Sequence, residues 1–357
     1  SNVEEAILRK FLEKKGHDEN VIQKTVDYVL AAAHGSGTSI YDANKSFYSL
    51  LRYGVKVKPG VGEQTETVWL IDWNDPNANH FVVAEEVTVL GQHTKRPDVV
   101  LYVNGLPLVI IELKQAAAKN ATVEGAYNQI QTYLREFPMA FRFCAFVVAS
   151  DGLSAKYGTP WTPYNHFAPW NVDDEGHLME FGETDLDGEA TTELDLTLTG
   201  LFNIDRFGQI MRDFIAFDQS EEGLGKRIAK PHQYFAVTKA VASTINAVDS
   251  DGRAGVVWHT QGSGKSMEME LYTAKVMRHQ RLAHGRHHGH RTRGHVGHRH
   301  PGDRVGRAAL LDGDRGQFPQ TTQQHDDAWP RDGPDACGAE FVGGAEGADH
   351  VDEALQR

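Results

Sequence analysis

The sequence predicts an α/β protein, with a mixed sheet flanked by helices, then the beginning of a phosphate-loop lobe, then an irregular tail. Three observations support this fold class. Helical and strand-like hydrophobic periodicities alternate along residues 41–150, which is typical of α/β proteins. A short apolar run at 255–259 leads directly into a glycine-rich loop. Beyond residue 278, large apolar residues become too rare to form a core.

Length, charge and cysteine content narrow the class of protein. A chain of 357 residues corresponds to about two domains. The net charge of −13 excludes a wholly basic nucleic-acid-binding protein, although a local basic groove could still bind DNA. No apolar run is long enough to span a bilayer. Cys144 and Cys337 form neither a disulfide framework nor a zinc knuckle. We therefore expect a soluble, cytoplasmic protein that does not associate with a membrane.

The first domain is predicted to span residues 1–220. Apolar residues at three- and four-residue spacing predict helices, and short runs rich in valine, isoleucine and aromatic residues predict strands. The helices are expected at 4–14, 21–33, 41–53 and from Asn120 or Thr122 to about 137. The strands are expected at 67–72, 81–90, 98–103, 106–113 and 143–149. Residues 151–225 contain many prolines, glycines and acids, and we interpret them as a linker with one helix at about 202–217.

The second predicted domain spans residues 221–278 and is followed by a tail of unusual composition. The domain contains a helix at 231–248, the strand at 255–259, the glycine-rich loop and a further helix. The tail, residues 279–357, has eight histidines between His279 and His300 and contains no Lys, Ile, Asn, Tyr or Met. It could be a metal-binding histidine tract, a disordered tail or the product of a coding-frame error. We favour the frame error because the missing residue types have AT-rich codons, and we assign the tail no fold.

Two acids and one lysine define the first candidate site. Glu112 and Lys114 are two residues apart on a predicted strand, so both point to one face, and Asp98 begins the preceding strand. Two carboxylates suit a hard cation such as Mg²⁺, which polarises a phosphate and lowers the pKa of a bound water. The lysine could orient that water or neutralise developing charge. These residue types indicate phosphodiester cleavage, although charged residues at the ends of an ordinary hairpin would show the same pattern.

The hairpin between these strands needs a particular register. With a two-residue turn at Asn104-Gly105, the numbers of paired residues sum to 209, which places Asp98 and Glu112 on opposite faces. The sum must be even for the two acids to share a face. We therefore predict either a three-residue loop with Gly105 in the left-handed conformation or a β-bulge. Pro107 fits this prediction because it cannot donate a ladder hydrogen bond.

A second candidate site lies at residues 260–266, Thr-Gln-Gly-Ser-Gly-Lys-Ser. Glycines let backbone amides close around phosphate, and the N-terminus of the following helix adds a favourable dipole. Lys265 would reach the β- and γ-phosphates of ATP, and Ser266 would bind Mg²⁺. His259 stands where the general motif has glycine. A Gly/Ser linker would explain neither the preceding strand nor the Lys-Ser pair. The other residues predicted to contact the nucleotide are Thr260, Gly262, Ser263 and Gly264.

Together the two sites resemble the restriction (R) subunit of type I restriction-modification enzymes. The resemblance covers roughly residues 40–277 and is most specific in five segments: Arg96–Leu101, Asn104–Lys114, Gln129-x-x-x-Tyr133, Ser150-Asp151-Gly152 and 255–266. It implies a restriction-endonuclease-like fold with a PD-(D/E)xK nuclease centre. It also implies that the second domain begins a RecA-like lobe of a superfamily 2 DNA translocase. The implied partners are double-stranded DNA and the methyltransferase and specificity subunits of the same system.

The resemblance also implies roles for individual residues. Asp98 and Glu112 would hold Mg²⁺, and Lys114 would serve the attacking water. Gln129 and Tyr133 would support DNA contact and catalysis, although a surface polar pair on one helix face would have the same spacing. Gln233 would contact the adenine of ATP, or would be an ordinary polar residue at a helix N-terminus.

The resemblance ends where family members continue with an Asp-Glu-Ala-His box and a second ATPase lobe. Residues 351–354, Val-Asp-Glu-Ala, are similar to that box only by coincidence, because no apolar strand precedes them. The chain therefore looks truncated, and we expect no DNA-stimulated ATP hydrolysis from it. Two functions stay open: a Mg²⁺-dependent endonuclease subunit that works with ATP-driven translocation in the full-length protein, or a non-catalytic remnant that docks on partners. A small-molecule kinase would explain only residues 255–277.

Overall fold

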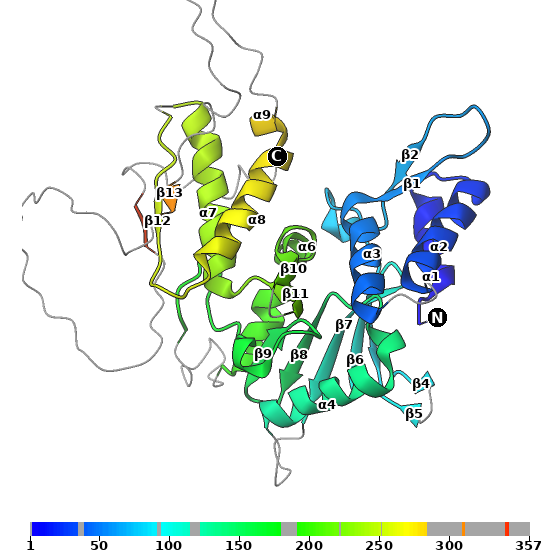
Figure 1. Ribbon diagram of the computed structural model, residues 1–357, viewed down its shortest axis with the longest axis horizontal. Coiled ribbons are helices and arrows are strands. Elements are labelled where there is room, and N and C mark those ends of the chain that lie inside the picture. Colours follow the sequence, from blue (N-terminus) through cyan, green and yellow to red (C-terminus); the bar gives the residue numbers. More distant parts are fainter. Residues whose placement is uncertain are drawn as a thin grey trace, which may run out of the picture. The chain divides into compact units, whose positions relative to one another are not determined.

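The computed structural model describes residues 2–34, 39–90, 94–114, 122–179, 191–220, 223–250, 252–283, 309–310 and 340–342. The chain forms two compact units, of which the first comprises Ser1–Asp174 and Leu178–Lys230 and the second Glu175–His177 and Pro231–Arg357. Figure 1 shows the elements of each unit. The division falls after Lys230, whereas we predict the boundary at residue 220. The difference arises because a hairpin whose two strands lie before and after residue 221 belongs to the first unit.

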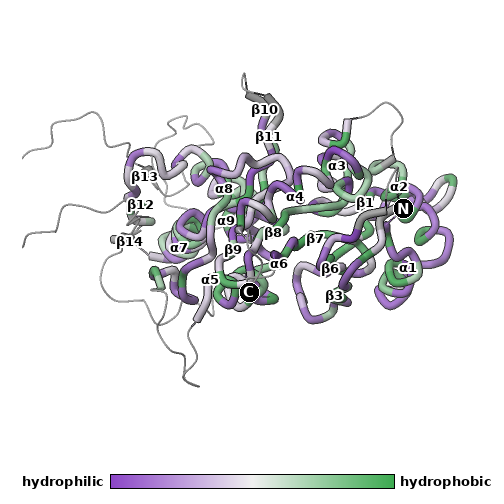
Figure 2. Tube along the Cα trace, turned by 90° about the horizontal axis from the view of Figure 1, so that it is seen from below, coloured by the Kyte–Doolittle hydropathy of each residue, from purple (hydrophilic) through white to green (hydrophobic). Residues whose placement is uncertain are grey.

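A mixed five-stranded sheet forms the centre of the first unit, in the order β3-β6-β7-β8-β9. Strands β7 and β8 run parallel, and the other neighbours are antiparallel. Figure 2 shows these two central strands in the hydrophobic part of its colour scale, and seven of the eight residues of β7 are buried. The predicted α/β class, with helices flanking a mixed sheet, is therefore confirmed. The strand bounds are Phe81–Glu85 (β3), Val99–Val103 (β6), Leu106–Leu113 (β7), Phe146–Ser150 (β8) and Ala155–Gly158 (β9).

Two helices of the first unit, α3 and α4, begin at side-chain caps that the sequence provides. Ser39 caps α3 by accepting a hydrogen bond from the Asp42 amide, and Thr122 caps α4 by accepting one from the Gly125 amide. Of the two candidate caps, Asn120 and Thr122, the structure therefore shows Thr122 as the cap of α4. Asn120 lies outside the described residues. The α-helices are Glu5–Lys14 (α1), Glu19–His34 (α2), Ile40–Tyr53 (α3), Val123–Glu136 (α4), Glu193–Leu196 (α5) and Ile204–Asp213 (α6).

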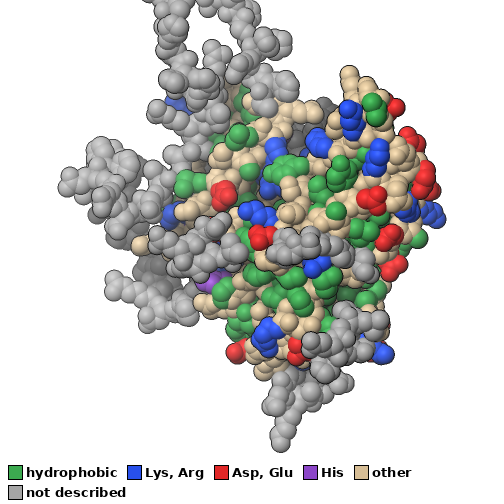
Figure 3. Space-filling view, turned by 45° about the vertical axis from the view of Figure 1, so that its right-hand side comes forward, with side chains coloured by type: hydrophobic (Ala, Val, Ile, Leu, Met, Phe, Trp, Pro, Cys, Tyr) green, Lys and Arg blue, Asp and Glu red, His purple; other side chains and the backbone are tan. Residues whose placement is uncertain are grey.

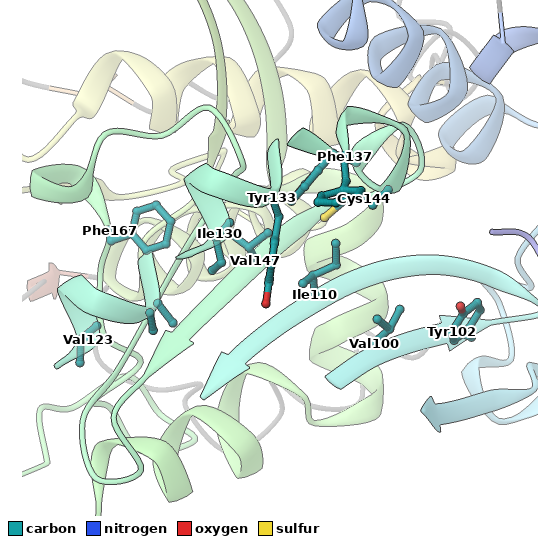
Figure 4. Packing of buried hydrophobic residues seen from close by; sticks show 14 residues of the cluster. Val100, Tyr102, Ile110, Val123, Ile130, Tyr133, Phe137, Cys144, Val147 and Phe167 are labelled. Atoms are coloured by element: carbon teal, nitrogen blue, oxygen red, sulfur yellow. The ribbon is translucent and has the colours of Figure 1, made fainter. Parts of the chain in front are cut away.

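Helix α4 packs on β7 and β8 and covers one face of the sheet (Figure 1). The core between them contains Ile110 and Val147 from the strands and Ile130 and Tyr133 from the helix. Figure 4 shows the Tyr133 ring extending from α4 toward the sheet between Ile110 and Val147. The apolar stripe of α4 therefore fixes where its polar neighbours lie along the sheet.

Several predicted elements differ from the structure. The strand at 67–72 is the shorter β2, Glu66–Val68, which pairs with β1, Val55–Val57. The strand at 81–90 is broken after β3, because Glu86 has a positive φ of 46°. Its second part, β4 (Val89–Leu90), pairs with β5 (Thr94–Lys95). The predicted linker at 151–225 contains β9 and most of a hairpin, β10 (Ile215–Ser220) and β11 (Gly223–Ile228). The predicted helix at 202–217 accordingly ends at Asp213.

The second unit begins with α7, Pro231–Val248, as predicted. Its strand β12, Val256–Trp258, runs parallel to β13 (Ala309–Leu310) and antiparallel to β14 (Glu340–Val342). Helix α8, Lys265–Arg278, follows the glycine-rich loop and is followed by α9, Gln280–Ala283. Most of the tail, including Cys337 and residues 351–354, lies outside the described residues. None of the helices in the described ranges combines the length and apolar character needed to cross a membrane.

Candidate functional site

The turn between β6 and β7 is tight. Asn104 and Gly105 have positive φ angles of 50° and 81°, and Val103 pairs with Leu106. This is a two-residue turn of the type that suits the twist of antiparallel strands, so the predicted three-residue loop is wrong. Glycine is required at position 105 for a second reason: a Cβ atom there would lie 2.4 Å from the Glu4 backbone oxygen.

A β-bulge then shifts the register of this hairpin. Tyr102 pairs with Pro107, whereas Leu101 pairs with Val109, so Leu108 is the extra residue. Beyond the bulge, the numbers of paired residues sum to an even value, as the first candidate site requires. The alternative prediction of a bulge is therefore confirmed, and it lies next to the proline that cannot donate a ladder hydrogen bond.

The bulge brings the two predicted acids together. Val99 pairs with Ile111, and one step further along the register Asp98 lies opposite Glu112. Glu112 shares the sheet face of Ile110, which packs against α4. Asp98 Oδ2 accepts a hydrogen bond of 2.7 Å from the Leu113 amide, which holds the carboxylate at the end of β7.

Glu112 is a buried carboxylate that is only half satisfied. Its side chain is 3% exposed, and Lys114 Nζ donates to its Oε1 at 2.8 Å. The other oxygen, Oε2, is buried and has no hydrogen-bond partner among the described residues. Burial raises the pKa of Glu112 and the negative charge of Asp98 raises it further, whereas the hydrogen bond from Lys114 lowers it. An unpaired buried carboxylate oxygen is costly, so this site favours a cation beside Glu112.

Helix α4 adds the two polar residues that we associate with the acids. Burial raises the pKa of Tyr133, and the charges of Glu112 and Asp98 raise it further, whereas a hydrogen bond with the Gln129 side chain lowers it. The Tyr133 hydroxyl also donates to the Arg96 backbone oxygen at 3.4 Å. All five predicted residues of the first site therefore gather at one edge of the sheet.

The first site offers side chains that could be ligands of a divalent metal ion. Among the described residues, no group of three or more His, Cys, Asp or Glu side chains is arranged to hold a metal. The first site instead offers two carboxylates, one of which has a buried oxygen that no described residue hydrogen-bonds. Mg²⁺ is commonly held by one or two carboxylates together with water and substrate phosphate. Asp98 and Glu112 therefore fit Mg²⁺ in the presence of a phosphodiester.

Charge is mixed on the face of the molecule that Figure 3 draws. On the face drawn in Figure 3, Lys and Arg side chains are interspersed with Asp, Glu and hydrophobic side chains. This mixture of charges agrees with the acidic net charge of the chain.

The second candidate site has the backbone of a phosphate loop. Gly262 and Gly264 have positive φ angles of 83° and 87°, and Gly264 is the N-cap of α8 without any side-chain cap. Lys265 Nζ lies at the loop and donates to the backbone oxygens of His259 and Thr260, at 3.2 Å each. The loop therefore places a lysine and a helix N-terminus together, as phosphate binding requires.

Two other observations bear on nucleotide binding at this loop. Ser263 Oγ is buried and has no hydrogen-bond partner among the described residues, whereas Ser266 is exposed on the first turn of α8. Gln233, which is 4% exposed, donates from Nε2 to the backbone oxygens of Ser263 at 3.0 Å and Gly264 at 3.5 Å. The structure thus places Gln233 against the phosphate loop, and the orphaned hydroxyl fits a loop that binds a polar ligand.

Sequence reasoning missed one buried charged residue beside this loop. Glu268, on the first turn of α8, is 2% exposed in its side chain and bonded to His259. We noted His259 only as a departure from the motif, and an acid on an otherwise mixed helix gave no signal of burial. Hydrophobic periodicity identifies buried helix positions by their apolar residues. It therefore could not predict that the glutamate at position 268 is buried.

Comparison with known proteins identifies the class of protein. Residues 1–166 match the family described as "Type I restriction enzyme R protein N terminus", and residues 232–285 match the SWI2/SNF2 ATPase family. The chain is thus related to the N-terminal part of type I restriction R subunits, and the predicted resemblance is confirmed.

Individual relatives bear the same description. The putative type I restriction enzyme MjaIXP endonuclease subunit of Methanocaldococcus jannaschii is 35% identical over 67% of this chain and 24% of its own length. The type I restriction enzyme HindI endonuclease subunit of Haemophilus influenzae is 36% identical over 71% of this chain and 24% of its own length. The chain thus spans about a quarter of the length of these relatives.

Proposed function

We propose that this chain carries the DNA-cleaving centre of a type I restriction R subunit and hydrolyses phosphodiester bonds with Mg²⁺. One observation carries the proposal: the bulge at Leu108 aligns Asp98 with Glu112, whose buried Oε2 has no hydrogen-bond partner in the part of the chain that the structure describes. The names of the relatives, which describe endonuclease subunits, support the same function. In the full-length protein, cleavage would be coupled to ATP-driven translocation of DNA.

The side chains of the first site divide the chemistry among them. When bound, Mg²⁺ would polarise the scissile phosphate and lower the pKa of a bound water. Asp98 and Glu112 would hold the ion, and the Leu113 amide orients the Asp98 carboxylate. Lys114 lies at the same edge, where its charge would orient the attacking water or offset the developing negative charge. The Tyr133 hydroxyl, whose pKa is raised further above neutral pH, is protonated and can donate a hydrogen bond.

The phosphate loop would bind ATP with Mg²⁺. Lys265 would neutralise the β- and γ-phosphates, Ser266 would bind the ion, and the backbone from Thr260 to Gly264 would surround the phosphates. The orphaned Ser263 hydroxyl and the left-handed Gly264 support this function. Gln233 would hold the loop through its contacts with the loop carbonyls. The further proposed partners are double-stranded DNA and the methyltransferase and specificity subunits.

A nicking assay on supercoiled DNA tests the nuclease. We expect the purified chain to nick the plasmid in the presence of Mg²⁺ and to stop nicking when EDTA is added. The D98A, E112A and K114A variants should each lose nicking while retaining the far-UV circular dichroism of the wild type. Undiminished cleavage by all three variants would remove the assignment. A folded wild type that never nicks DNA would instead favour the non-catalytic docking function.

A further inference from the structure

A buried histidine–glutamate pair connects the two ends of the phosphate loop. His259 directly follows β12, and Glu268 lies in the first turn of α8. His259 Nδ1 lies 2.7 Å from Glu268 Oε1, and each side chain is only 2% exposed. The contact therefore fixes the distance between strand and helix without involving the loop backbone.

The pair is not fully satisfied within the described part of the chain. His259 Nε2 and Glu268 Oε2 are buried and have no hydrogen-bond partner there, and the same is true of Ser263 Oγ in the loop itself. Buried polar atoms without partners cost free energy, and a native structure that retains them calls for a functional or structural reason. Apolar side chains of similar size would fill the same space with a smaller loss of folding free energy, so packing alone does not explain the pair.

Further contacts link the pair to the loop. The His232 ring packs edge-on against the His259 ring with a centroid distance of 5.4 Å, and His232 Nε2 lies 3.0 Å from the Ser263 backbone oxygen. Lys265 Nζ donates to the backbone oxygen of His259. His259 thus contacts Glu268 through its ring and the phosphate-binding lysine through its carbonyl.

We propose that His259 and Glu268 form a positioning pair that holds the phosphate loop in the geometry that binds a nucleoside triphosphate. The proposal rests on the nucleotide binding proposed above. A loop whose ends are fixed loses less conformational freedom on binding, so the pair increases affinity without contacting the ligand. Because the pair acts through one hydrogen bond, an amide in place of the Glu268 carboxylate preserves its function.

The test uses isothermal titration of the full 357-residue chain with ATP and Mg²⁺. Glu268→Gln keeps an acceptor oxygen, whereas Glu268→Met removes it at similar volume. His259→Leu removes the other partner, and the double variant H259L/E268M leaves neither polar group buried alone, which favours folding. Glu270→Met, on an exposed residue of the same helix, is the matched control.

We expect E268M and H259L each to weaken ATP binding about tenfold, which corresponds to ~1.4 kcal/mol. This value lies within the range of interaction energies measured between residues in contact. The double variant should bind no more weakly than either single variant, although it unfolds at a temperature close to that of the wild type. E268Q and E270M should bind within about threefold of the wild type.

Four results would overturn the proposal. Wild-type affinity in E268M, or losses that multiply in the double variant, would show that the two residues do not act as a pair. A loss in E268Q as large as that in E268M would show that charge matters and geometry does not. If K265A abolishes binding while E268M binds normally, only the positioning pair fails. If the folded wild type binds no ATP, both the proposed nucleotide binding and the positioning pair fail.

Discussion

Lys226 gives a stability prediction whose magnitude follows from its surroundings. This residue of β11 is 1% exposed, and its Nζ donates to Asn44 Oδ1 and to the Cys144 backbone oxygen, at 2.9 Å each. Three aromatic rings lie 5.1–5.8 Å from the same ammonium, those of Tyr48, Trp161 and Phe217. Burial lowers the pKa of Lys226 from 10.5 to about 7.

The sign of the pH dependence follows from proton counting. Between pH 7 and pH 10.5, the unfolded chain carries a proton on Lys226 that the folded chain has lost. The free energy of unfolding therefore rises with pH across this window, by at most ~1.4 kcal/mol per pH unit and about 5 kcal/mol in total. The three rings favour the charged form by roughly 0.5–2 kcal/mol, so the total is an upper limit. Between pH 7.5 and 9.5 we expect a gain of about 2–3 kcal/mol.

Urea unfolding followed by tryptophan fluorescence measures this gain. Lys226→Met keeps the length of the side chain and removes its titration, so we expect the variant to show no gain between pH 7.5 and 9.5. Lys10→Met, on an exposed residue of α1, should behave as the wild type. A K226M variant that gains as much stability as the wild type would refute the reasoning.

Three further predictions concern the sheet and its site. Because burial raises the pKa of Glu112, its ionised form destabilises the folded chain at neutral and higher pH; E112Q should increase the free energy of unfolding at pH 8 by about 1 kcal/mol, and a lower urea midpoint would contradict this. G105A should lower stability by about 2 kcal/mol or more because the position has φ 81° and a Cβ would meet the Glu4 oxygen. A Cβ atom at Gly208 in α6 would meet nothing within 4 Å among the described residues, so G208A should raise stability by up to about 1 kcal/mol. Equal shifts in the unfolding temperatures of G105A and G208A would contradict both predictions. Insertion of an alanine between Val109 and Ile110, beyond the bulge, moves Glu112 one position away from Asp98 in the register and should abolish nicking; retained nicking would show that the register is not required.

The register of the β6–β7 hairpin was predictable because it depends on parity. Side chains alternate along a strand, so a shared face for Asp98 and Glu112 requires an even sum whatever the turn is. The choice between a longer loop and a bulge was not predictable. It depends on the close approach of Gly105 to the Glu4 backbone, which is a tertiary contact between distant segments.

The β10–β11 hairpin was missed because its stability does not come from its own sequence. Acids, serines and glycines at 218–225 indicate a loop. The hairpin is held instead by long-range contacts: the Tyr41 hydroxyl donates to the backbone oxygens of Asp218 and Gly225, and Thr159 Oγ1 donates to that of Lys226. A buried lysine is also contrary to the usual exposure of this residue type, so no sequence pattern indicated it.

Binding of Mn²⁺, used in place of Mg²⁺ and followed by electron paramagnetic resonance without ATP, tests the central claim most directly. The claim is that the bulged hairpin brings Asp98 and Glu112 together as ligands of one divalent ion. We predict that a short DNA duplex increases Mn²⁺ binding to the wild type, and that D98N and E112Q each weaken this binding at least tenfold. Unchanged Mn²⁺ affinity in both variants would contradict the account.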